Sequence, residues 1–123
     1  MDMNDYQAVA HQTAIYPDLY IGVGEIGPNR IAPWLYPSIG LVGEAGELAN
    51  KVKKILRDHN GEMDGDMRHE IALELGDVLW YVAELAGAIG YSLGSIAEMN
   101  EANLRNRAAT NSLRGSGDGR GEE

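Results

Sequence analysis

The sequence of 123 residues contains no cysteine, few aromatic residues and fewer basic than acidic side chains. Without cysteine, disulfides, zinc–thiolate sites and a thiol nucleophile are all excluded. The 10 basic and 19 acidic residues give a net charge of −9. This balance argues against a nucleic-acid polymer as partner, because contacts with phosphates need an excess of lysine and arginine.

Long hydrophobic runs and a leader pattern are also missing. The longest apolar stretch, residues 78–91, contains Glu84 and two glycines and is too short to span a bilayer. The first residues lack the basic and then apolar segments of a signal peptide. We therefore expect a cytoplasmic protein, with one domain over residues 1–114 and a glycine-rich tail over residues 115–123.

The pattern that is present is helical. Apolar residues recur at three- and four-residue steps over residues 38–57 and 66–90, which predicts two long amphipathic helices. A short helix is predicted over residues 2–15, and a last one from residue 92 or 95 to about residue 109. Strand-like alternation is absent from this region, and short connections favour antiparallel neighbours. The predicted fold is all-α, of the four-helix-bundle type.

Residues 16–37 contain all four prolines and separate the first two predicted helices. Proline and glycine at this density predict a loop, in which residues 19–23 could form a short strand or turn. A loop of this length is either a binding loop or a connector packed by its own aromatic side chains. The sequence leaves both interpretations open.

Two pairs of acidic residues lie in the long helices, Glu44 with Glu47 and Glu74 with Asp77. A three-residue step turns a helix by about 300°, so the members of each pair project from one side. If the helices face each other, four carboxylates converge and must take up protons or bind cations. Oxygen ligands without histidine or cysteine favour magnesium or manganese. Alternatively, these acids lie on solvated faces and pair with nearby lysines.

Each acidic pair encloses a glycine, Gly46 in the first and Gly76 in the second. A glycine inside a helix costs roughly 1 kcal/mol, so we expect a compensating close approach of a neighbouring helix or a phosphate. An acidic helical interaction module would explain the charge and the amphipathic helices equally well. It would not explain these two glycines, and it remains the second hypothesis.

Three segments, GLVGEAGELANKVKKILRD, ELGDVLWYVAELAGAIGYSL and NEANL, together resemble the MazG-like family of all-α nucleoside triphosphate pyrophosphohydrolases. The family motif has a doubled glutamate, a third glutamate and then ExxD on the next helix. This chain matches it at Glu44, Glu47, Glu74 and Asp77. Gly43 takes the first place of the doublet, as in short, phage-type members, whose terminal segments this chain also resembles.

The resemblance implies that the chain hydrolyses an NTP or dNTP to the monophosphate and pyrophosphate. Glu44, Glu47, Glu74 and Asp77 would be the catalytic residues and the ligands of two or three Mg²⁺ ions, for which Mn²⁺ can substitute. Water activated by the metal would attack the α-phosphate, with Glu47 or Glu74 taking its proton. The breadth of the family favours deoxypurine substrates, guanine first. A nucleotidase that releases orthophosphate is the alternative within the enzyme class.

Substrate contacts are expected from cations, an asparagine and aromatic side chains around these carboxylates: Lys51, Lys54, Trp34, Tyr81, Asn103, Arg105, Arg107 and Arg120. The family usually has a lysine three residues after Asn103. This chain has Asn106 there, so the neighbouring arginines are the candidates for phosphate binding. The two lysines could equally be solvated. Trp34 and Tyr36 could line a base pocket or the core, whereas Trp80 is expected in the core.

The predicted apolar stripes are wider than one chain of this size can cover. A large apolar surface left in water favours association, and a two-fold dimer is the simplest arrangement that covers it. The family resemblance likewise implies a homodimer or homotetramer. In such an assembly the C-terminal arginines of one chain would reach phosphates held by the other.

Overall fold

The computed structural model describes residues 1–16 and 33–110. These residues form four helices and no strand: α1 (Met3–Gln12), α2 (Leu35–Asp58), α3 (Gly65–Ala88) and α4 (Leu93–Ala109). The all-α prediction is therefore confirmed. The candidate strand at residues 19–23, the domain boundary at residue 114 and Arg120 lie outside the described residues. None of the four helices is both long and apolar enough to cross a membrane.

Side-chain caps set where three of the helices begin. Asp2, Asp64 and Ser92 precede α1, α3 and α4, and each accepts a hydrogen bond from a backbone N–H three residues on. Such caps satisfy amide groups that the first helical turn leaves unpaired. Helix α2 has no side-chain cap and begins at Leu35, three residues before the predicted start. Pro37 lies in its first turn, where a missing N–H costs no helical hydrogen bond.

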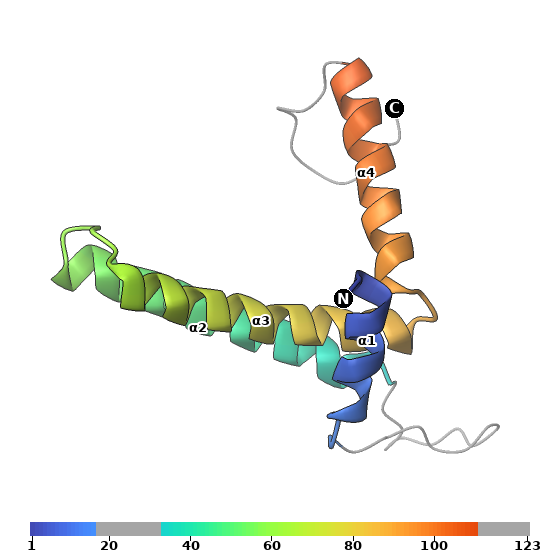
Figure 1. The fold of residues 1–123 in the computed structure, drawn as a ribbon, viewed down its shortest axis with the longest axis horizontal. Helices are drawn as coiled ribbons and strands as arrows, with labels where there is room; N and C mark the ends of the chain where they lie inside the picture. Colours follow the sequence, from blue (N-terminus) through green and yellow to red (C-terminus); the bar gives the residue numbers. More distant parts are fainter. Residues whose placement is uncertain (17–32, 111–123) are drawn as a thin grey trace.

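Helices α2 and α3 form a long antiparallel hairpin (Figure 1). The connection turns through Asn60 and Gly61, both with positive φ. Helix α1 crosses the C-terminal end of α3, and α4 leaves that end and points away from the hairpin (Figure 1). In the part of the chain described, α4 contacts α1 and α3 but not α2. The described residues of a single chain therefore leave the bundle open.

A small core lies where α1, α3 and α4 meet. It consists of Ala10, Ala83, Ala86 and Leu93. Trp80 packs against it, as the sequence predicted, and its indole N–H donates to the Thr13 hydroxyl at 2.8 Å. Small side chains in this core let the crossing helices approach closely.

Two amides on α1 fix the turn between α3 and α4. The Gln7 side chain donates to the carbonyl of Tyr91 at 3.0 Å and accepts from the N–H of Leu93 at 3.0 Å. Asn4 accepts from the N–H of Gly94 at 2.9 Å. These bonds satisfy backbone groups at the turn, and so they set the direction in which α4 leaves.

The apolar stripe of α2 is only half covered in one chain. Leu41, Leu48 and Ile55 are buried or half-buried. A second set at helical spacing is exposed by 36–72%: Leu35, Ile39, Val42, Val52 and Leu56. An exposed apolar strip along the full length of a helix is typical of a surface that packs against another chain.

Candidate functional site

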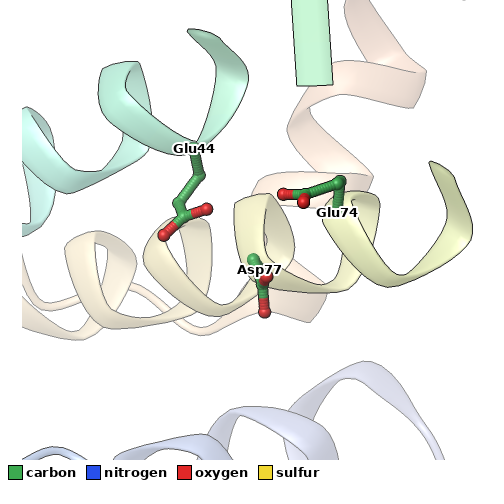
Figure 2. A group of neighbouring side chains, drawn as sticks. All are labelled: Glu44, Glu74 and Asp77. Atoms are coloured by element: carbon green, nitrogen blue, oxygen red, sulfur yellow. The ribbon is translucent and has the colours of Figure 1, made fainter. Parts of the chain in front are cut away.

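The hairpin brings together three of the four predicted carboxylates. Oxygen atoms of Glu44, Glu74 and Asp77 all lie within 4.8 Å of one another, with Glu44 from α2 facing the other two from α3 (Figure 2). The three-residue step on α3 places Glu74 and Asp77 on one side of the helix. The antiparallel pairing places Glu44 opposite them. Glu47, one turn further along α2, is exposed and lies outside this group of three.

Two oxygens of this group are buried without a hydrogen-bond partner among the described residues. Glu74 is only 8% exposed, and its Oε1 pairs with Lys51 Nζ at 2.9 Å. In the described structure, Glu74 Oε2 and Glu44 Oε2 have no hydrogen-bond partner. A buried polar oxygen without a partner costs free energy. Hard divalent cations prefer sites made only of oxygen ligands. These carboxylates therefore fit Mg²⁺ or Mn²⁺.

Burial and the neighbouring charges both act on Glu44. Burial raises the pKa of the Glu44 carboxyl. Repulsion from Glu47 and a hydrogen bond shared with it raise this pKa further, as do Asp77 and Glu74. The hydrogen bond to Glu74 raises the pKa of Lys51 and keeps that side chain cationic. Without a bound cation, the repulsion from neighbouring carboxylates therefore favours the protonated form of Glu44.

The prediction that Gly46 and Gly76 allow a close helix approach is wrong for this chain. A Cβ built at either position meets nothing within 4 Å in the described structure, because both glycines lie on exposed parts of their helices. The close approach occurs instead at Gly40, where a Cβ would overlap the Tyr81 ring. The alternative explanation for Gly46 and Gly76, the approach of a phosphate, stays a prediction.

Two tyrosine hydroxyls lie near enough to the carboxylates to respond to their charge. Burial raises the pKa of Tyr81, and Tyr36, Glu44 and Asp77 raise it further. Burial and the charge of Asp77 also raise the pKa of Tyr6 on α1. The sequence pattern pointed to Tyr81 but not to Tyr6. Local periodicity placed Tyr6 on one side of the first helix and could not show that this helix crosses α3 beside Asp77.

The remaining predicted substrate residues are spread over the molecule. Lys51 reaches Glu74, whereas Lys54 is exposed, and Trp34 precedes α2 with half of its surface exposed. Asn103, Arg105 and Arg107 lie in the second half of α4, which points away from the hairpin (Figure 1). Arg105 pairs with Glu101 on its own helix. Within one chain, the structure does not bring this part of α4 to the carboxylates.

Comparison with known proteins gives two matches. The MazG nucleotide pyrophosphohydrolase domain matches residues 38–108, which include all four predicted carboxylates and most of α4. The "Gene 37 protein" of Mycobacterium phage L5 is 44% identical to this chain over 120 residues, covering 98% of the chain and 100% of the phage protein. No solved structure matches the chain.

Proposed function

Because the chain belongs to the MazG nucleotide pyrophosphohydrolase family, we propose that it hydrolyses nucleoside triphosphates to the monophosphate and pyrophosphate. The observation that carries this proposal is the group of three carboxylates, in which two buried oxygens have no hydrogen-bond partner among the described residues. A solvated acidic face would leave no such oxygens. In our proposal Glu44, Glu74, Asp77 and the adjacent Glu47 hold two or three divalent cations, Mg²⁺ first and Mn²⁺ as a substitute.

The bound cations, Lys51 and Glu47 would each have a separate role in the reaction. Bound Mg²⁺ would supply positive charge for the triphosphate oxygens and activate water for attack at the α-phosphorus. Lys51 holds an ammonium group at the edge of the carboxylates, where it can contact a phosphate oxygen. Glu47 lies beside Glu44 but outside the group of three, so its carboxylate oxygen that binds no cation is our candidate to take the proton from the attacking water.

We further propose that the active form is a homodimer or homotetramer. The exposed apolar strip along α2 needs a covering surface, and α4 carries its arginines away from the carboxylates of its own chain (Figure 1). A second copy could cover the strip and receive Asn103, Arg105 and Arg107 at its own phosphate site. Light scattering on the active protein tests this, and a mass near the 13.3 kDa of one chain would contradict it.

The activity is tested with the eight common NTPs and dNTPs in the presence of Mg²⁺, with every product identified. We expect monophosphate and pyrophosphate, with deoxypurines and dGTP in particular turned over fastest. Diphosphate and orthophosphate would reject attack at the α-phosphorus. The absence of turnover with every nucleotide would favour the acidic interaction module. The Asp77→Asn variant is the control for a contaminating hydrolase, because it alters only this chain.

A further inference from the structure

The side of α3 that carries Glu74 and Asp77 continues for two more turns. Tyr81 follows Asp77 by four residues and Glu84 follows Tyr81 by three, so all four share one side of the helix. Glu84 is 5% exposed, and neither the carboxylate group nor the family match explains why an acid is buried there. Along this side the surroundings change from carboxylates to aromatic rings.

Four aromatic rings from three segments contact one another in series beyond the carboxylates. Tyr81 packs edge-on against Trp80, with ring centroids 5.0 Å apart, and Trp80 packs edge-on against Tyr16 at 6.1 Å. Tyr16 in turn stacks on Tyr36 with centroids 4.6 Å apart and ring planes 13° apart. Tyr36 is 42% exposed, so part of this stacked pair faces solvent.

The charged carboxylates and the aromatic rings beside them suit the phosphate end and the base end of a nucleotide, respectively. The carboxylates are suited to the cations that bind a triphosphate, and flat aromatic rings are suited to a nucleobase. Tyr36 also raises the pKa of Tyr81, which feels the charge of Glu44 and Asp77 as well. Tyr81 therefore lies near both the stacked pair and the carboxylate group.

Glu84 is the residue that fixes the stacked pair. The Tyr16 hydroxyl donates to Glu84 Oε2 at 2.9 Å, and His11 Nδ1 lies 3.2 Å from the same oxygen. The Glu84 side chain is 3% exposed, and a carboxylate so deeply buried is stable only when it is hydrogen-bonded. Its partners come from α1 and from the residues after α1, so Glu84 ties that segment to α3.

We propose that Glu84 is a positioning residue for nucleoside recognition, and that it holds Tyr16 on Tyr36 as the surface against which the nucleobase packs. This inference rests on the proposed function, because it assigns the base end of the same substrate. Glu84 itself touches neither the substrate nor the metal. Its effect passes through the Tyr16 hydroxyl.

The test compares a nucleotide with its phosphate portion alone. For wild type, Tyr16→Phe, Glu84→Leu and Glu84→Gln, we would measure the KM for dGTP and the inhibition constant of inorganic tripolyphosphate, which lacks a nucleoside. We expect Tyr16→Phe and Glu84→Leu to raise the KM about tenfold, the loss expected for one good hydrogen bond. Inhibition by tripolyphosphate should not change. Glu84→Gln, which still offers an oxygen to the Tyr16 hydroxyl, should restore the KM.

Thr13→Val is the matched control, because it removes the hydrogen bond from Trp80 at the same junction and leaves the Tyr16 anchor intact. Its KM should equal that of wild type. Equal weakening of dGTP and tripolyphosphate by Tyr16→Phe, or an unchanged KM, would overturn the inference. If Glu84→Leu does not fold, Tyr16→Phe still decides the outcome.

Failure of the proposed function would be recognised separately. If wild type hydrolyses no nucleotide, the binding of dGTP and of tripolyphosphate can still be compared by calorimetry in the same variants. Tighter binding of dGTP that is lost in Tyr16→Phe would support the inference without hydrolysis. Equal binding of the two compounds by wild type would overturn it.

Discussion

Two buried glutamates on one side of α3 have opposite surroundings. Glu84 is 5% exposed, and its carboxylate has a tyrosine hydroxyl and a histidine as partners. Glu74 is 8% exposed, and one of its oxygens pairs with Lys51 while the other has no hydrogen-bond partner in the described structure. Burial is the same, but the partners differ. A buried carboxylate whose bonds are satisfied ties elements together, whereas one left incomplete beside other carboxylates is suited to binding a cation, as we propose for Glu74.

The largest effect is expected from Asp77→Asn, which keeps the shape of an exposed side chain and removes one ligand charge. We expect turnover to fall on the order of a thousandfold, because in the proposed mechanism catalysis depends on charge stabilisation by bound metal. Steady-state kinetics with Mg²⁺ check this, with Glu98→Gln, an exposed acid on α4, as the control. Near-normal turnover of the Asp77 variant would remove this residue from the proposed ligand set.

The second prediction compares the contributions to stability of Glu84 and of Glu44, the carboxylate that faces Glu74 from α2. Glu84→Leu leaves Tyr16 and His11 without their acceptor, which should lower the free energy of unfolding by about 1.5–3 kcal/mol. Glu44→Leu removes a carboxylate that its neighbours repel, so without metal the protein should be as stable or more stable. Urea denaturation in a chelator measures both variants. Equal destabilisation would show that the two acids have the same structural role.

Sequence patterns predicted the four helices well because capping and periodicity are local properties. Asp64 and Ser92 cap helices close to where the pattern placed them. The spacing within each acidic pair likewise predicted which carboxylates share a side. The sequence could not show the crossing of α1 over α3, which depends on the alanine core and on Gln7. Tyr6 and the Glu84–Tyr16 contact were missed for this reason, although Glu84 has the helical spacing that continues the side of Asp77.

Magnesium should stabilise the folded protein by binding to Glu44, Glu74 and Asp77, and it should not bind at Glu84. A ligand that binds only the folded state at a hundredfold excess over its Kd adds about 2.7 kcal/mol. We therefore expect the melting temperature to rise by several degrees with Mg²⁺ and to fall back to its metal-free value when a chelator is added. The rise should vanish in Asp77→Asn and persist in Glu84→Gln. A rise that persists in the Asp77 variant would place the cation at another site.

The pKa of Glu44, raised by burial and by Glu47, predicts a pH dependence without metal. A carboxyl whose pKa is higher in the folded state binds its proton more tightly there, so the unfolded state releases the proton first. Its contribution to stability is then greatest below the pKa of the unfolded state and is lost as the pH rises through the folded pKa. The stability gained by Glu44→Gln over wild type, measured in chelator, should therefore grow between acidic and neutral pH. A difference that does not change with pH would contradict the raised pKa.

The smallest effect concerns Gly76, which lies between Glu74 and Asp77 with open space where a Cβ would be. Gly76→Ala should stabilise α3 by up to about 1 kcal/mol, because alanine is the better helix former. Gly43→Ala, also in open space, is the matched control and should stabilise α2 by a similar amount. Gly40→Ala should instead destabilise, since its Cβ would overlap the Tyr81 ring. The KM for dGTP tests the phosphate explanation for Gly76. If a phosphate approaches the backbone at Gly76, the Gly76→Ala variant should have a higher KM for dGTP, while Gly43→Ala should leave the KM unchanged. Equal KM values for the two variants would mean that Gly76 serves neither a neighbouring helix of this chain nor the substrate.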